Sequence, residues 1–201
     1  MEINRRLFRF ENRLNALQNS IAAHDNDQSL SCNEQFIVER ALMQLQTEWE
    51  LFVRNLILDS SLGKYTINSK LIKSTTVISL ANRESASHYL ISLYPKRNKE
   101  PDWYLPNDAI RAAQLLSVSN FSNISAQLGL TPWVLDDLRY VRNFIAHKSK
   151  SSAIKLRNQN LIISQDPITA VKCAFAYNKN GIKNYIAWVQ FIKFVSKSLA
   201  A

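Results

Sequence analysis

The segment from Leu138 to Lys148 contains the residues whose types and spacing are best suited to chemistry. Arg142 and His147 enclose four residues, and the first of these is the polar Asn143. Histidine is the side chain best suited to proton transfer near neutral pH, and arginine carries a permanent charge in a planar fork that matches phosphate oxygens. Asn143 can orient either group or a phosphate oxygen. This set fits metal-free cleavage of an RNA phosphodiester, which needs a base, an acid and a cation for the phosphorane.

Helical spacing predicts which neighbours share a face with the histidine. Asp136, Tyr140, Asn143 and His147 follow spacings of 4, 3 and 4, so on a helix they lie on one polar face, and Arg142 lies on its flank. Asp136 and Tyr140 are therefore candidate supporting residues, although a solvated helix face and partial burial explain them equally well. His147 lies near the predicted helix end, where the helix dipole favours its charged form.

The excess of positive over negative charge lies entirely in the last third of the chain. The net charge is +9; residues 1–141 hold 15 Lys/Arg and 15 Asp/Glu, whereas residues 142–201 hold 10 Lys/Arg and one acid, Asp166. Such asymmetry favours a polyanionic partner, and RNA is the first candidate, over a basic face kept for solubility. The predicted RNA phosphate-binding residues follow the motif directly: Lys148, Lys150, Lys155 and Arg157.

The motif resembles the R-x(4–6)-H motif of the HEPN superfamily, in which the residue after the arginine is typically polar. Residues 46–53, with their aromatic and acidic side chains, look like an early helix of these domains. The run Pro101-Asp102-Trp103, followed by a helix and Gly129, looks like the RiboL-PSP-HEPN subgroup. The resemblance covers about residues 34–150.

The resemblance implies an all-α, HEPN-like helical bundle and a metal-independent endoribonuclease. Arg142 and His147 would be catalytic, and the products would carry a 2′,3′-cyclic phosphate and a 5′-hydroxyl. It further implies a homodimer with a composite active site, because one histidine does not easily serve as both acid and base. The implied setting is a toxin or phage-defence effector, with an antitoxin or defence-system partner protein.

Three alternatives to a ribonuclease stay open. Basic residues often end helices by bonding the last carbonyls, which would account for Arg142 and His147 without catalysis. A catalytically inactive HEPN protein would bind RNA, a nucleotide or a partner protein. A structural subunit of a larger defence complex would dock through the N-terminal helix.

Neither a metal nor a cofactor is expected. The three histidines are dispersed, and His24 and His88 have no companions that suggest a role. Cys32 and Cys173 lie far apart and are expected to be reduced, partly buried thiols. With only 3 glycines, the chain lacks a Gly-rich phosphate loop.

Hydrophobic periodicity predicts the elements that position the motif. An N-terminal heptad helix is expected over residues 3–21, a second helix from a Ser31–Glu34 capping box to Gly63, and a final helix over about 183–199. Shorter helices are expected over 83–94, 107–116 and 122–128, and the motif helix is expected to start at Pro132 behind a Thr131 cap. Residues 60–80 are expected to be irregular with short pieces, 149–160 a basic turn, and 161–164 a short strand.

The predicted division of the chain has three parts. Residues 1–30 form the N-terminal helix and linker, 31–150 the HEPN-like core, and 151–201 a small basic C-terminal segment whose final helix packs on the core. No apolar run approaches the roughly 20 residues that cross a bilayer, and the N-terminus lacks the apolar stretch of a signal peptide. A cytoplasmic protein without membrane partners is therefore expected. Trp103 and Tyr104 lie in a loop, as stacking candidates or, more simply, as loop anchors.

Overall fold

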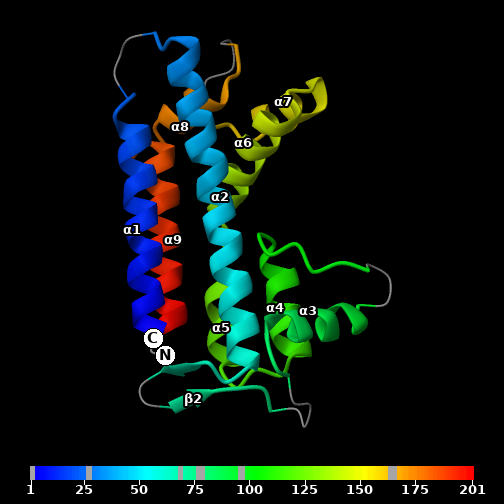
Figure 1. The fold of residues 1–201 in the computed structure, drawn as a ribbon. Helices are drawn as coiled ribbons and strands as arrows, with labels where there is room; N and C mark the ends of the chain where they lie inside the picture. Colours follow the sequence, from blue (N-terminus) through cyan, green and yellow to red (C-terminus); the bar gives the residue numbers. More distant parts are fainter. Residues whose placement is uncertain (1–2, 26–28, 68–69, 76–79, 95–97, 163–166) are drawn as a thin grey trace. The chain divides into compact units, whose positions relative to one another are not determined.

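The computed structural model describes residues 3–25, 29–67, 70–75, 80–94, 98–162 and 167–201. Within these ranges the chain forms nine α-helices and one small antiparallel sheet, so the predicted all-α class is confirmed (Figure 1). The elements are α1 (Ile3–Ala22), α2 (Cys32–Ser61), β1 (Tyr65–Ile67), β2 (Lys70–Ile72), α3 (Arg83–Ser92), α4 (Pro106–Leu115), α5 (Phe121–Leu128), α6 (Leu135–His147), α7 (Lys150–Arg157), α8 (Ala170–Phe175) and α9 (Asn184–Ala200). No helix in the described ranges is long and apolar enough to cross a membrane.

The fold divides into two compact units. Unit 1 comprises Met1–Phe10, Trp49–Leu130 and Val195–Ala201, and unit 2 comprises Glu11–Glu48 and Thr131–Phe194. Unit 1 therefore contains one end of each of the helices α1, α2 and α9, together with the β-hairpin and α3 to α5. Unit 2 contains the remaining parts of these three long helices, together with α6, α7 and α8. The predicted boundaries at residues 30 and 150 stay a prediction.

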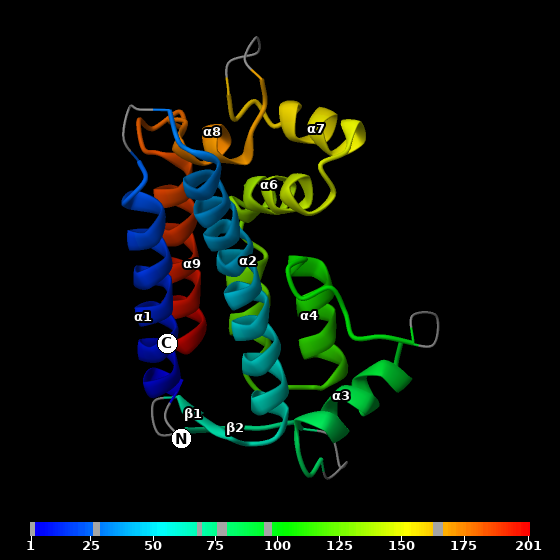
Figure 2. The same cartoon turned by 45° about the horizontal axis from the view of Figure 1, so that its top comes forward.

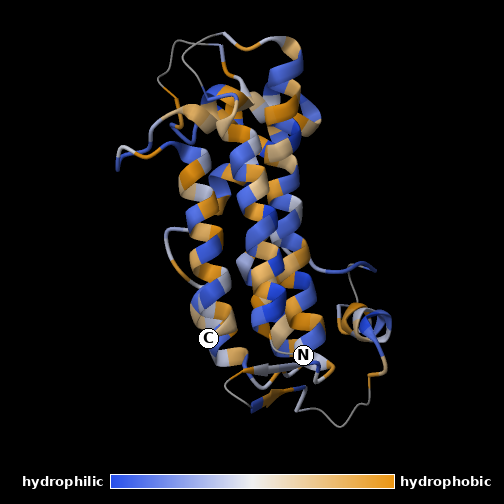
Figure 3. Cartoon of the chain, turned by 60° about the vertical axis from the view of Figure 1, so that its left-hand side comes forward, coloured by the Kyte–Doolittle hydropathy of each residue, from blue (hydrophilic) through white to orange (hydrophobic). Residues whose placement is uncertain are grey.

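The three long helices form because their apolar residues recur at helical spacing. The residues at these spacings form a seam on each helix and are all buried or half-buried: Ile3, Leu7, Phe10, Leu14, Leu17 and Ile21 of α1, and Val38, Ala41, Leu45, Trp49, Phe52 and Leu56 of α2. Hydrophobic and hydrophilic residues alternate along these helices (Figure 3). The Ser31–Glu34 capping box that begins α2 is present: the Ser31 backbone N–H donates to Glu34 across 2.8 Å, and the Glu34 N–H donates to the Ser31 hydroxyl across 3.3 Å. Gly63 follows the end of α2 with φ +67°, a conformation that favours glycine.

Unit 1 is held by two ion-pair clusters. Asp59 of α2 is almost fully buried and accepts hydrogen bonds from Arg6, Arg83 and Tyr65. Residues 65–67 pair with 70–72 as a hairpin, which replaces part of the predicted irregular segment.

In the second cluster, the Arg54 guanidinium donates two hydrogen bonds of 2.6 Å to the Glu100 carboxylate, and the Trp103 indole N–H donates to the same carboxylate across 2.8 Å. Trp103 is 7% exposed, which confirms that it anchors its loop. These charged groups are tolerated below the surface because each has a partner.

In unit 2 the parts of α1, α2 and α9 that belong to it lie side by side (Figures 1 and 2). Glu48 is buried, and its carboxylate has two partners: Arg13 pairs with it at 3.0 Å and Gln44 donates a hydrogen bond to it. Trp188 of α9 is buried, and Trp133 packs edge-to-face on Phe191 with ring centroids 5.1 Å apart.

Several predicted local structures were wrong. The motif helix α6 begins at Leu135, because Thr131 and Pro132 lie in a preceding turn in which the Asp136 N–H donates to the Trp133 carbonyl. α4 begins with Pro106 at its first position, so Asn107 does not cap it. Two helices, α7 and α8, were not predicted. The predicted strand at 161–164 falls partly outside the described residues.

Candidate functional site

The motif helix α6 is oriented by its apolar side. The spacing of Val134, Leu138, Val141 and Ile145 predicts an apolar stripe on this helix. The buried residues are Leu135, Leu138, Val141 and Ile145, which confirms the stripe except that Val134 lies before the helix and is half-buried. Asp136 and Asp137 lie in the first turn, where negative charge is favourable to the helix dipole. Burial of this stripe presents the opposite, polar side of α6 to solvent.

The end of α6 is a tight junction. His147 is the last helical residue, and Lys148 adopts a left-handed conformation with φ +41° while its N–H donates to the Phe144 carbonyl across 2.8 Å. The Lys148 ammonium pairs with Glu39 of α2 at 3.2 Å. His147 is therefore held at a fixed helix end, and the chain turns immediately after it.

A capping box starts the next helix two residues later. The Ser149 hydroxyl accepts the Ser152 N–H across 3.1 Å, and the Ser152 hydroxyl accepts the Ser149 N–H across 3.1 Å. This reciprocal pair makes α7 begin at Lys150, in the stretch expected to be a basic turn. The first N–H groups of a helix have no partner within it, so the start of α7 offers donors and a partial positive charge.

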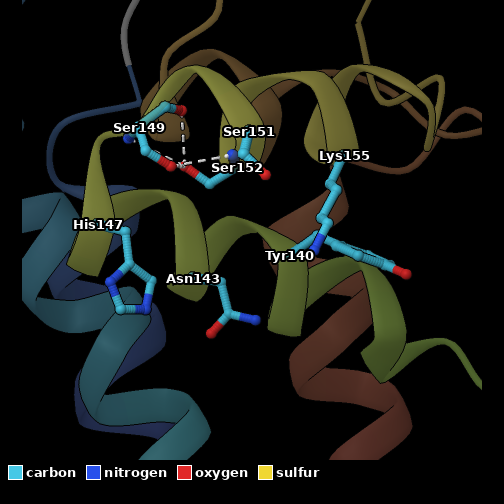
Figure 4. Close-up of a pocket in the computed structure, with 7 residues that line it drawn as sticks. All are labelled: Tyr140, Asn143, His147, Ser149, Ser151, Ser152 and Lys155. Carbon is cyan, nitrogen blue, oxygen red and sulfur yellow. Dashed lines mark hydrogen bonds between the residues drawn. The ribbon is translucent and has the colours of Figure 1, made fainter.

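A pocket of about 250 Å³ lies where α6 and α7 meet (Figure 4). Three of the predicted site residues on α6 line it: Tyr140, Asn143 and His147. The first turn of α7 and Lys155 complete the lining, through Ser149, Ser151, Ser152 and Lys155. In Figure 4 the His147 and Asn143 side chains extend from the same side of α6, and Lys155 extends from α7 toward α6.

Arg142 does not line this pocket. Its side chain is half-buried on the flank of α6, and its Nη1 donates a hydrogen bond to Oδ1 of Asn143 across 3.3 Å. The structure therefore connects the predicted catalytic pair through Asn143. This places Asn143 between the arginine and the pocket that contains the histidine.

Asp136 also lies outside the pocket, although it shares a helix face with Tyr140. It pairs with Arg139 at 3.0 Å, and the Arg139 guanidinium lies over the Tyr140 ring, 4.7 Å from its centroid. Arg139 therefore links Asp136 to Tyr140, which lines the pocket. Of the two predicted supporting residues, the structure brings Tyr140 into the pocket and not Asp136.

The four predicted phosphate-binding residues have different surroundings. Lys155 lines the pocket, Lys148 pairs with Glu39, and Lys150 and Arg157 lie exposed at the two ends of α7. Of these four residues, Lys155 is therefore the one that lines the same pocket as His147.

Comparison with family models, with curated proteins and with solved structures gave no match. The resemblance to the HEPN superfamily consequently rests on the sequence features alone, the Arg142–His147 motif above all. Within the described ranges, no group of three His, Cys, Asp or Glu side chains is arranged to hold a metal ion. Cys32 is exposed and Cys173 is buried, and burial, with a smaller contribution from the charge of Asp137, raises the pKa of the Cys173 thiol to about 12.

Sequence reasoning missed the serines of the pocket. Ser149, Ser151 and Ser152 belong to the stretch predicted to be a basic turn, although the spacing Ser149-x-x-Ser152 is compatible with an N-terminal cap. That signal was weak because a capping box more often pairs the serine with Glu or Gln at the fourth position. The pocket presents a proton-transfer group, amide and hydroxyl donors, and a cation within one concave surface, which suits an anion such as a phosphodiester.

Proposed function

We propose that the protein is a metal-independent endoribonuclease that cleaves RNA by attack of the 2′-hydroxyl on the adjacent phosphorus. One observation carries the proposal: His147 and Asn143 line a pocket with Lys155 and the first turn of α7, and Arg142 donates to Asn143. The products would be a 2′,3′-cyclic phosphate and a 5′-hydroxyl. This is also the activity that the resemblance of the motif to the HEPN superfamily implies.

The chemistry assigns a role to each group. His147 takes the proton of the 2′-hydroxyl or donates one to the departing 5′-oxygen, since imidazole is suited to both near neutral pH. The α7 N–H groups and Lys155 hold the phosphate that enters the pocket. Arg142, oriented by Asn143, stabilises the charge that develops on the phosphorane oxygens.

A single chain supplies only half of the proton transfers. One pocket contains one histidine, and neither a second histidine nor Arg142 lines it. We therefore propose a homodimer in which two motifs meet and the second copy supplies the complementary acid or base. The proposed setting is a cytoplasmic toxin or phage-defence effector that an antitoxin or defence-system partner protein restrains.

The test is incubation of the purified protein with total RNA in EDTA, followed by end-group analysis of the fragments. We expect cyclic-phosphate ends from the wild type, and losses of 100-fold or more, on the order of the contribution of general acid–base catalysis, for His147→Ala and Arg142→Ala. His88→Ala and Arg5→Ala are matched controls, because both side chains are exposed and lie outside unit 2. Full activity in both site variants would rule out the proposal.

The position of Arg142 favours one alternative, a protein that binds RNA without cutting it. Because Arg142 does not line the pocket, a chain that never dimerises would keep the phosphate site without complete catalytic machinery. Filter binding that shows retained RNA, with no cyclic-phosphate product at any protein concentration, would assign this role. Light scattering on the same samples would show whether the inactive protein is monomeric.

A further inference from the structure

A second, larger pocket lies at the other end of α6 within unit 2. It has a volume of about 560 Å³ and is formed by the start of α6, the turn at 177–180 and the first turns of α9. A volume in this range is typical of sites that bind small ligands. The proposed ribonuclease chemistry makes no use of it.

Aromatic rings form part of its lining. Trp133, Tyr177 and Trp188 all line the pocket, and Tyr177 is 67% exposed. The Tyr177 backbone is held by an isolated β-bridge between Tyr177 and Lys183, and the Lys183 ammonium lies 5.5 Å from the centroid of the Tyr177 ring. A large exposed ring on a fixed backbone is a stacking surface for a planar ligand.

Asp137 places an available hydrogen-bond acceptor in the same pocket. Asp136 beside it pairs with Arg139, but no residue in the described ranges forms an ion pair or hydrogen bond with the Asp137 carboxylate. Burial, and then the charge of Asp136, raise the pKa of Asp137 to about 6. At pH 7 the carboxylate is therefore mostly ionised and lacks a donor, which a ligand can supply.

Asn178 adds a hydrogen-bond donor to the pocket, beside the acceptor that Asp137 provides. Its Oδ1 accepts the backbone N–H groups of Asn180 and Ile182, across 2.9 and 3.1 Å, which fixes the amide with its NH₂ group left to donate. Gly181, with φ +71°, lets the chain make this tight turn. The pocket thus combines a carboxylate acceptor, an amide donor and stacking rings.

We infer that this pocket binds a guanine base. The Watson–Crick edge of guanine has two adjacent donors, N1–H and the N2 amine, which match a carboxylate, and beside them the O6 acceptor, which matches an amide donor. Adenine, cytosine and uracil each lack the second adjacent donor. Lys179 also lines the pocket and disfavours a cationic ligand, while it suits the phosphate that a nucleotide carries.

This inference deepens the proposed function. It rests on that function for one point, namely that the guanine bound here is part of a substrate RNA. Asp137 and Asn143 are separated by six residues of one helix, a rise of about 9 Å. Arg139 connects the two pockets physically, because it pairs with Asp136 on one side and stacks on Tyr140 on the other. A guanine bound here would set which phosphodiester enters the pocket with His147.

The first experiment measures binding of GMP, AMP, CMP and UMP to the full chain by isothermal titration at pH 7.5. We expect GMP to bind most tightly, and Asp137→Asn to weaken GMP binding about tenfold or more, since a bidentate base contact is worth at least that in discrimination. Glu84→Gln, at an exposed position of α3 in unit 1, is the matched control and should leave GMP affinity unchanged.

The second experiment sequences the ends of RNA fragments cut by the wild type and by Asp137→Asn. We expect enrichment of guanosine at a fixed position near the cut, which the substitution removes. Cleavage without base preference, together with equal binding of the four nucleotides, overturns the guanine pocket and leaves the ribonuclease proposal standing. Selective, Asp137-dependent GMP binding without any cleavage supports the pocket and refutes the ribonuclease. Binding of spermidine in place of all four nucleotides would assign the pocket to cations and overturn the inference.

Discussion

The Arg142 guanidinium donates a hydrogen bond from Nη1 to Oδ1 of Asn143, across 3.3 Å, and Asn143 lines the pocket that contains His147. Because the two residues are adjacent on α6, their side chains leave the helix in different directions. The hydrogen bond holds the Arg142 guanidinium beside Asn143, which lies on the polar side of α6. The amide is therefore the contact through which the arginine is coupled to the pocket.

Replacement of Asn143 tests that coupling. Asn143→Ala removes the acceptor for Arg142, and we expect the turnover number for RNA to fall about tenfold to 100-fold, since positioned hydrogen-bond donors at a developing oxyanion are worth on that order. Asn12→Ala, at an exposed position of α1, is the control. Single-turnover cleavage of a defined RNA measures the effect, and an unchanged rate in Asn143→Ala would show that Arg142 acts independently of the amide.

The capping box of α7 has both a stability effect and an activity effect. Ser149→Ala removes the side-chain cap at the Ser152 N–H, and we expect a loss of about 1 kcal/mol in the free energy of unfolding. Because the first turn of α7 lines the pocket, RNA affinity should fall as well. Denaturant titration and filter binding measure the two effects. Ser151→Ala is the comparison, because Ser151 lies in the same turn but does not cap it; equal stability of the two variants would contradict the capping role of Ser149.

Lys155 and Lys148 should differ in RNA binding. Lys155→Ala removes a cation that lines the pocket, and we expect the slope of log affinity against log salt to become shallower by about one unit. Lys148→Ala should change the slope less, because Glu39 already neutralises that ammonium. Filter binding across a salt series gives both slopes, with Lys70→Ala in unit 1 as the control. Equal changes for Lys155 and Lys148 would mean that the pocket does not select the phosphate.

The contribution of Asp137 to the free energy of unfolding is smaller at neutral pH than at acid pH. Its folded pKa of about 6 lies above the usual value, since burial and then Asp136 disfavour its ionised form. The stability that comes from the neutral acid is complete below about pH 4 and is lost as the pH rises through 6. We expect Asp137→Asn to be more stable than the wild type at pH 7.5, on the order of 1 kcal/mol after allowance for solvent screening. Thermal unfolding at pH 4 and 7.5 measures this, and a constant difference at both pH values would refute it.

Glu100 has the opposite dependence. Burial alone would raise its pKa, but hydrogen bonds from Arg54, Ser87 and Trp103 outweigh it and lower the pKa to about 2. Its contribution to stability is therefore present above about pH 4.3, the usual value for glutamate, and is lost as the pH falls toward 2. We expect Glu100→Gln to lose about 1 kcal/mol at pH 7, discounted for partial exposure, and clearly less at pH 2, where the folded-state carboxyl is about half protonated, as measured by denaturant titration at both pH values. Cleavage activity should not change, because Glu100 lies in unit 1.

The amino-acid sequence alone was sufficient to predict the long helices and the apolar side of the motif helix. The seam of α1, the capping box of α2 and the stripe at Leu138, Val141 and Ile145 are local patterns with helical spacing, and burial of such stripes is what stabilises helices in a folded chain. The candidate residues Tyr140, Asn143 and His147 were found for the same reason, since one helix face is defined by spacing.

What surrounds that face was decided only by the tertiary structure. The left-handed turn at Lys148 and the Ser149 cap fold α7 over the end of α6, and this brings Lys155 and three serines into the pocket that His147 also lines. Contacts of this kind depend on the direction in which the chain leaves a helix, which periodicity does not encode. Two ion pairs have the same physical cause. Lys148 pairs with Glu39, more than 100 residues away in the chain, and Asp136 pairs with Arg139 outside the pocket, because side chains pair with the groups that packing brings near them.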